Sequence, residues 1–149
     1  MIINKYTIGL VFYMLFSICV VIGCSNQEDS NNIPTLNAQW SDSTQTRSIP
    51  VTVATYNWNG QMTYGGPWEA TEKQKPTIVK GNANIQLSFS KKNPDEILII
   101  EYPSKTEFKN IDKASNQIIV PNKPGVYVFG VDGTWGNDSV MYALKVKVK

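Results

Sequence analysis

The stretch of sequence that decides the fold is GVYVFGVDGTW-GND-SVMYALKVKV, residues 125–148. Its two halves flank Gly136-Asn137-Asp138, a turn-forming cluster, and therefore predict a β-hairpin. Apolar side chains alternate along the second half at Val140, Tyr142, Leu144, Val146 and Val148, and the other face carries Ala143, Lys145, Lys147 and Lys149. A period of two predicts a strand with one buried and one solvent face. Lysines also discourage pairing at sheet edges.

Upstream of this hairpin the β pattern extends back to Ile49. Short runs rich in β-branched and aromatic residues, separated by turn residues, lie at 51–58, 77–80, 85–90, 96–102 and 118–120. About seven short strands in about 100 residues indicate an all-β fold, a single antiparallel β-sandwich over 49–149. The run 96–102 is apolar on both faces, which is typical of a central strand.

The same alternation predicts which side chains form the core between the two sheets. The predicted core residues are Leu87, Phe89, Leu98, Ile100, Tyr127, Phe129, Tyr142, Leu144 and Val146. Trp135 falls in phase with Phe129, so a core position is favoured for it as well.

The beginning of the chain has the pattern of a secretory signal. Lys5 precedes an apolar run, residues 6–22, and the run ends in Gly23-Cys24. A plain transmembrane anchor is the alternative, since about 17 apolar residues lie at the lower limit for crossing a bilayer. We predict a signal peptide at 1–23 and expect Cys19 to leave with it.

The sequence Val21-Ile22-Gly23-Cys24 resembles the lipobox of bacterial lipoproteins. The resemblance implies that Cys24 becomes the first mature residue and carries a lipid such as palmitate. It also implies a location at the cell membrane, lipid-anchored on the extracytoplasmic face.

The domain itself resembles small lipoprotein domains of Gram-positive bacteria. The likeness rests on scattered aromatic, Gly and Pro positions from Tyr56 to Val148. Pro124-Gly125-Val126-Tyr127 also enters its strand much as a tyrosine corner does in immunoglobulin-like domains. The family is largely uncharacterised, so the resemblance implies an immunoglobulin-like β-sandwich and no activity.

Residues 24–48 are rich in Ser, Asn, Asp, Gln and Thr. A segment this polar has little to bury, so we predict a flexible, disordered tether. Trp40 is the exception, and it either docks on the domain or begins its first strand.

Composition excludes several functions. The chain has 149 residues, 14 Lys or Arg and 12 Asp or Glu; loss of Lys5 with the signal leaves a net charge of +1. This balance gives no reason to expect nucleic acid as a partner. The chain has no histidine, which removes the commonest general base and transition-metal ligand. We expect no cofactor and no metal.

Ser88-Phe89-Ser90-Lys91 matches the Ser-x-x-Lys pattern of serine acyltransferases. In those enzymes the lysine lies one helical turn from the serine. Here the four residues belong to a strand pattern, which puts Ser88 and Lys91 on opposite faces. We interpret the match as chance and predict no catalytic residue.

Four acidic residues could supply the carboxylate pair of a glycoside hydrolase. They are Asp95, Glu96, Asp132 and Asp138. Solvated turn positions are the favoured explanation for all four. A cell-envelope hydrolase that uses carboxylates is therefore the alternative function, not the main one.

The uncharged segment 57–68 is rich in aromatic residues and glycine and lies between two predicted strands. Rigidly held aromatic loops often bind flat ligands, so Tyr64 and Trp68 are candidate ligand contacts on a loop from Asn59 to Trp68. The alternative is that Trp58 is core and the loop folds its rings inward. The main prediction is a non-catalytic binding or adaptor module for an envelope protein, a wall polymer or a small ligand. Contact of Lys145, Lys147 and Lys149 with anionic lipid is less favoured than a solvated face.

Overall fold

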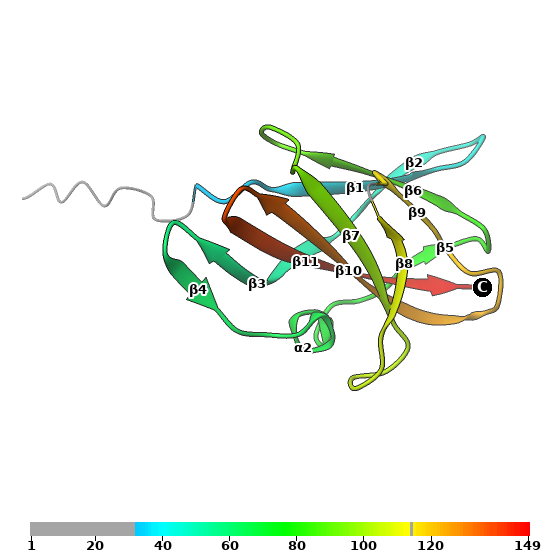
Figure 1. The fold of residues 1–149 in the computed structure, drawn as a ribbon. Coiled ribbons are helices and arrows are strands. Elements are labelled where there is room, and N and C mark those ends of the chain that lie inside the picture. Colours follow the sequence, from blue (N-terminus) through cyan, green and yellow to red (C-terminus); the bar gives the residue numbers. More distant parts are fainter. Residues whose placement is uncertain (1–31, 114) are drawn as a thin grey trace, which may run out of the picture. The chain divides into compact units, whose positions relative to one another are not determined.

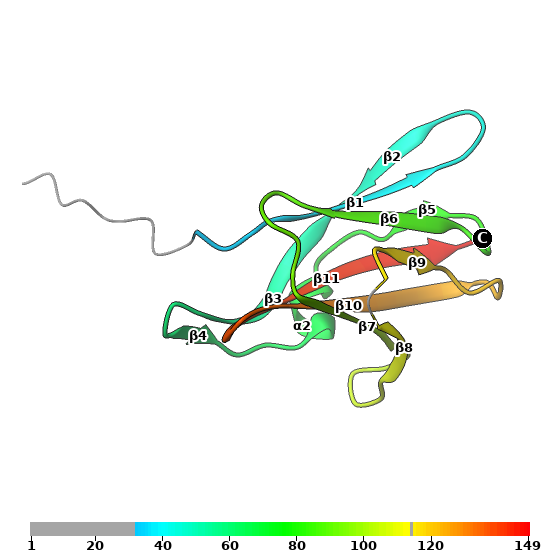
Figure 2. The same ribbon diagram turned by 45° about the horizontal axis from the view of Figure 1, so that its top comes forward.

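The computed structural model describes residues 32–113 and 115–149, and there the chain folds into two β-sheets that face each other (Figures 1 and 2). The smaller sheet has the order β2-β1-β6-β9 and the larger has the order β4-β3-β11-β10-β7-β8, with β5 also paired to β11. The strands are β1 (Leu36–Ser41), β2 (Thr46–Ile49), β3 (Val51–Trp58), β4 (Gln61–Thr63), β5 (Thr77–Val79), β6 (Asn84–Phe89), β7 (Glu96–Tyr102), β8 (Lys109–Lys113), β9 (Gln117–Ile119), β10 (Gly125–Trp135) and β11 (Asp138–Val148). The predicted all-β antiparallel sandwich is confirmed.

The hairpin of β10 and β11 forms the middle of the larger sheet. The two strands pair from Gly125 opposite Val148 to Trp135 opposite Asp138. β7 lies against the other side of β10, and β3 lies against β11. Apart from the parallel contact of β5 with β11, the sheets pair antiparallel.

The tether predicted at 24–48 is wrong for residues 33–48. β1 pairs with β2 and with β6, and the compact unit begins at Ile33. Leu36, Ala38 and Trp40 are buried and alternate with exposed polar residues. This period of two is what makes the segment a strand, although its mean composition is polar. Trp40 therefore belongs to the first strand, while residues 24–31 and the predicted signal at 1–23 lie outside the described residues.

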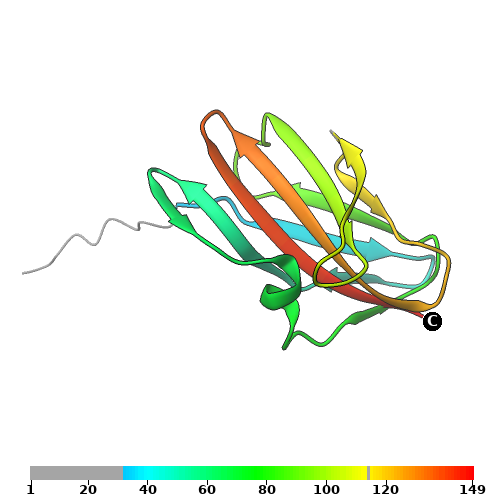
Figure 3. The same ribbon diagram turned by 60° about the horizontal axis from the view of Figure 1, so that its bottom comes forward.

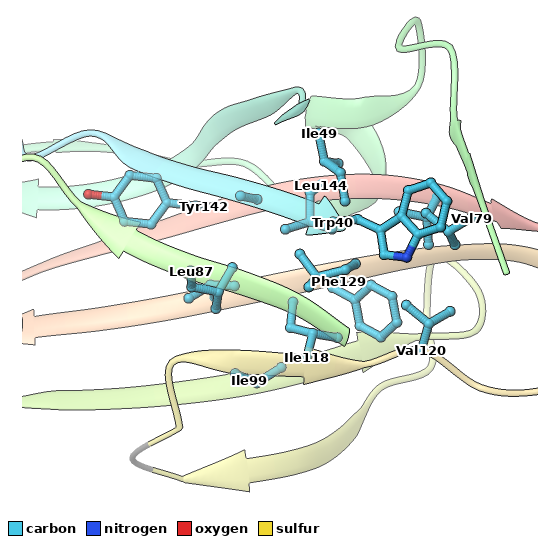
Figure 4. Packing of buried hydrophobic residues seen from close by; sticks show 14 of the residues in the cluster. Trp40, Ile49, Val79, Leu87, Ile99, Ile118, Val120, Phe129, Tyr142 and Leu144 are labelled. Carbon is cyan, nitrogen blue, oxygen red and sulfur yellow. The ribbon is translucent and has the colours of Figure 1, made fainter. Parts of the chain in front are cut away.

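The core lies between the two sheets (Figure 4). Five of the predicted core residues are buried there, namely Leu87, Phe129, Tyr142, Leu144 and Val146. Phe89, Tyr127, Trp58 and Trp135 are half-buried and pack against the same cluster. Two of these rings meet edge to face, with 5.5 Å between the centroids of Trp58 and Trp135. The Tyr142 hydroxyl donates a hydrogen bond to the carbonyl of Pro34, just before β1.

Leu98 and Ile100 do not lie in this cluster, although Ile100 is buried. Ile99 is fully buried in the cluster and Ile97 packs against it, so the even-numbered residues of β7 point to the outer face of the larger sheet. Because this strand is apolar on both faces, periodicity could not decide which set faces inward.

The outer face of the larger sheet is partly covered by a short helix, α2 (Pro67–Thr71). Figure 2 shows α2 on the side of this sheet that faces away from β1 and β6. Ala143, predicted to face solvent, is fully buried. Gly130 permits the close approach, since a Cβ atom there would lie 2.9 Å from the Tyr102 ring and 3.3 Å from Pro67.

Lys145 holds the end of this helix instead of extending freely into solvent. Its Nζ atom donates hydrogen bonds to the carbonyls of Thr71 at 2.8 Å and Glu72 at 3.4 Å. Cations at a helix C-terminus satisfy carbonyls that have no partner within the helix. Within the described part of the chain, no helix has the length and hydropathy needed to cross a bilayer.

Tyr127 has the hydrogen bond expected of a tyrosine corner. Its hydroxyl donates to the carbonyl of Lys123 at 2.7 Å, four residues upstream. In immunoglobulin-like domains the corresponding tyrosine bonds in the same way to the backbone just before its strand. The immunoglobulin-like part of the fold assignment stays a prediction.

The corrected domain boundary can be tested with Trp40→Ala. This variant removes a large buried ring, so we expect a loss of about 3–5 kcal/mol in the free energy of unfolding. Gln39→Ala, at the exposed neighbouring position, is the matched control and should change it by less than about 0.5 kcal/mol. The measurement is urea denaturation. Equal midpoints for the two variants would mean that Trp40 is not part of the folded domain and that the tether extends to residue 48.

Candidate functional site

A cavity of about 250 Å³ opens on the outer face of the larger sheet. It is lined by the β3–β4 hairpin and the β10–β11 hairpin, which are neighbours in the ribbon of Figure 3. Its lining residues come from β3, β4, β10, β11 and the residue after β4: Thr55, Tyr56, Asn57, Met62, Thr63, Tyr64, Asp132, Ser139 and Met141. Strand register explains why they meet. Met141 lies opposite both Asp132 and Thr55, so these three side chains form a row across the sheet.

The β3–β4 hairpin is fixed at its tip. Asn59 and Gly60, both with positive φ, form its two-residue turn. The amide of Asn59 donates to Oδ1 of Asp138 at 3.0 Å, which ties this turn to the start of β11. The predicted loop from Asn59 to Trp68 is thus a short strand followed by a helix, and only its middle is irregular.

Tyr64 stands at the rim of the cavity with 87% of its surface exposed. Its hydroxyl donates to Sδ of Met62 at 2.9 Å. The next residue, Gly65, lies directly against β3, since a Cβ atom there would be 2.6 Å from the carbonyl oxygen of Ala54. The backbone on both sides of Tyr64 is therefore held while its ring stays in solvent.

Asp132 is the charged residue of the lining. It lies within β10, half-buried, with Leu98 and Met141 opposite it on the two neighbouring strands. Its carboxylate has no hydrogen bond or ion pair to a side chain in the described part of the chain. Burial raises its pKa, and its charge adds to the burial that raises the pKa of Tyr102. A carboxyl group held where its charge is disfavoured is a common property of functional sites.

Trp68, the second predicted contact, lies elsewhere. It is half-buried in α2 and lines a separate cavity of about 80 Å³ with Glu69, Glu72 and Lys105. Lys105 and Glu69 form an ion pair of 3.0 Å at this cavity. The indole Nε1 is buried and has no hydrogen-bond partner in the described residues. The structure does not bring Trp68 and Tyr64 into one cavity.

The other candidate carboxylates hold turns. Asp95 forms an ion pair of 3.1 Å with Lys92 and accepts a hydrogen bond of 2.9 Å from the amide of Gly136. The Lys92 hydrogen bond is the main cause of its lowered pKa. Asp138 accepts the Asn59 amide, and Glu96 is an exposed residue at the start of β7.

Asp95 and Ser88 line a third cavity, of about 560 Å³, near the β6–β7 connection. Ser88 lies in β6, so Lys91 is not one helical turn away from it. The expected strand placement holds for Ser88 and Phe89, whereas Ser90 and Lys91 follow the end of β6.

Sequence reasoning treated Asp132 as a solvated turn residue, and this was wrong. The turn begins after Trp135, so Asp132 belongs to the strand and its side chain alternates with buried Val131 and Gly133. Asp132 is a charged residue inside an otherwise uncharged strand, and this pattern could have indicated a functional position from the sequence.

Two further observations bear on the site. In residues 32–113 and 115–149, no group of three or more His, Cys, Asp or Glu is placed to hold a metal ion. No protein-family model matches the chain, and it matches neither a curated protein sequence nor a solved structure.

Asp132→Asn keeps the side-chain shape and removes the charge. Because burial raises the folded-state pKa above the ordinary value of 3.8, ionisation of Asp132 costs stability as pH rises through that folded pKa. We expect the variant to melt at a higher temperature than the wild type at pH 7, and at the same temperature well below pH 3.8. Calorimetry at the two pH values checks this.

Asp42→Asn is the control with the opposite sign. The Asp42 carboxylate accepts hydrogen bonds from the hydroxyl and the amide of Thr44, and they hold its pKa well below 3.8. Its stabilisation is present above pH 3.8 and is lost as pH falls through the folded pKa. This variant should melt lower at pH 7. A lower melting temperature for Asp132→Asn at pH 7 would mean that its carboxylate stabilises the fold.

Proposed function

We propose that this protein is a lipid-anchored binding module on the outer face of a bacterial cell membrane, with its ligand site at the cavity between Tyr64 and Asp132. The observation that carries the binding role is the pairing of an exposed, held aromatic ring with a half-buried carboxylate that has no partner in the described residues. Neither side chain belongs to the hydrophobic cluster between the sheets. Exposed rings and charges of this kind favour recognition.

The membrane location is supported by the sequence around Cys24, which lies outside the described residues. Eight residues, 25–32, lie between Cys24 and Ile33, where the compact unit begins. Even fully extended, they span about 30 Å. Stable anchoring needs more than one acyl chain, because a single chain binds a membrane only marginally.

A binding role is preferred to hydrolysis because of what the other carboxylates do. Asp95 and Asp138 accept backbone hydrogen bonds that hold turns, and the pKa of Asp95 is lowered. A general acid needs a raised pKa and access to the bond it protonates. The immunoglobulin-like assignment belongs to the same proposal and is supported by the Tyr127 hydrogen bond.

Lipidation is tested by labelling cells with a fatty acid that carries a click-chemistry handle. We expect the wild-type protein to be labelled and to sediment with membranes, because Cys24 provides the thiol that is acylated. Cys24→Ser should lose the label, while Cys19→Ser, the matched control, should keep it. Equal labelling of wild type and Cys24→Ser would refute the anchor.

The binding role is tested by comparing Tyr64→Ala with Trp68→Ala. Tyr64 is largely exposed, so its loss should move the melting temperature by less than about 2 °C while it measurably weakens capture of the envelope ligand. Trp68 is half-buried and its indole Nε1 is fully enclosed, so its loss should lower the melting temperature by several degrees.

Tyr64→Phe is the control that keeps the ring and should retain capture. The measurement is a pull-down from envelope extracts with the mature protein, beside thermal melting. Unchanged capture by a folded Tyr64→Ala variant would move the site elsewhere.

A further inference from the structure

The charge of the cavity is unbalanced. Asp132 is its acidic residue, and no lysine or arginine lines it. The other polar groups of the lining are the hydroxyls of Thr55, Tyr56, Thr63, Tyr64 and Ser139 and the amide of Asn57. These groups are neutral, so the carboxylate lacks a counter-charge at the point where burial makes a counter-charge most valuable. A cationic ligand would supply it.

The walls of the cavity suit a cation that carries methyl or methylene groups. Met62 and Met141 contribute thioethers, which are polarisable and adapt to irregular shapes. Tyr64 contributes an exposed ring, and its hydroxyl is turned back toward Met62. Aromatic faces attract ammonium groups electrostatically, and more so when the cation loses water. A strongly hydrated ion would gain less from such walls.

Size limits the ligand further. About 250 Å³ is below the usual range for drug-sized ligands, roughly 300–1,000 Å³. The space fits one small ion or one end of a longer molecule.

We propose that the cavity binds a small alkylammonium group, with Asp132 as its counter-charge and the Tyr64 ring as its cation–π partner. This inference rests on the proposed function and names the ligand class of that site. The ammonium group can belong to a soluble molecule or to a lipid headgroup, and the chemistry at the cavity is the same for both.

The test uses the mature lipoprotein, purified in a maltoside detergent that carries no ammonium group. Choline is the probe, and saturation-transfer NMR on its methyl protons measures binding. Its neutral isostere, 3,3-dimethylbutan-1-ol, is the matched control ligand. We expect choline to bind at least tenfold more tightly than the alcohol, because only choline carries the charge that Asp132 can pair.

Variants assign the binding to the cavity. Asp132→Asn should weaken choline binding tenfold or more, and Tyr64→Ala should weaken it roughly two- to fivefold. Tyr64→Phe should bind as the wild type does. Glu107→Gln removes an exposed carboxylate that does not line the cavity, so it controls for the loss of one charge. Thermal melting confirms that each variant is folded.

Equal binding of choline and the alcohol, or equal binding by wild type and Asp132→Asn, overturns the inference. If ligand capture from envelope extracts still depends on Tyr64 in that case, the proposed function survives and only the ligand class is wrong. If choline binding does not depend on Asp132 and ligand capture does not depend on Tyr64, the site itself is overturned.

A binding experiment with vesicles shows whether the ammonium group comes from a lipid headgroup or from a soluble molecule. Vesicles of phosphatidylcholine are compared with vesicles of phosphatidylglycerol for binding by the Cys24→Ser protein. Binding to phosphatidylcholine that depends on Asp132 supports the inference with a lipid source. Choline binding without such vesicle binding supports it with a soluble source.

Discussion

β10 and β11 pair along eleven residues each, and each strand has a further partner on its other side. Every other feature of the larger sheet is positioned by this ladder. Its inner face supplies Phe129, Tyr142 and Leu144 to the core, and its outer face supplies Gly130 and Ala143 to the contact with α2. Because register fixes the face of every side chain, a slip of one residue would exchange the two sets. The long hydrogen-bonded hairpin thus determines which side chains face the core and which face α2.

The same ladder explains why a carboxylate can persist in a half-buried position. Asp132 must point outward because Val131, its neighbour in the strand, points into the core. Helix α2 covers the outer face near Gly130 but stops short of Asp132, which stays at an open cavity. Its charge is disfavoured by burial and is not compensated by a described partner. Natural proteins tolerate such local costs mainly where a site needs them.

Much of the fold could be predicted from the sequence because its strands alternate strictly. The last hairpin, the core role of Leu144 and the packed position of Trp135 follow from period two and from turn residues. Prediction failed where periodicity was ambiguous or masked. β7 is apolar on both faces, so Leu98 and Ile100 were placed on the wrong one. β1 has only three apolar residues in a polar segment, and its strand is revealed by their spacing and not by their number.

The candidate site was predictable only in part, for a different reason. The segment around Tyr64 stood out because exposed rings without charge are unusual in a short connection. Nothing local could show that Asp132, 68 residues later, would line the same cavity, because cross-strand register creates that contact. Helix α2 was missed because five residues are too few for a helical period. Its formation separates Trp68 from Tyr64, two residues that the sequence had grouped.

The hydrogen bond from the Tyr142 hydroxyl to Pro34 has a consequence for orientation. It fixes the point where the chain enters the domain, and Met141, the neighbour of Tyr142, lines the cavity. In Figure 1 the start of β1 lies at the same end as the tips of the β3–β4 and β10–β11 hairpins. A tether attached ahead of Ile33 therefore meets the domain at the end that carries these two hairpin tips, and tension on it would act first on the strand whose neighbouring residue lines the cavity.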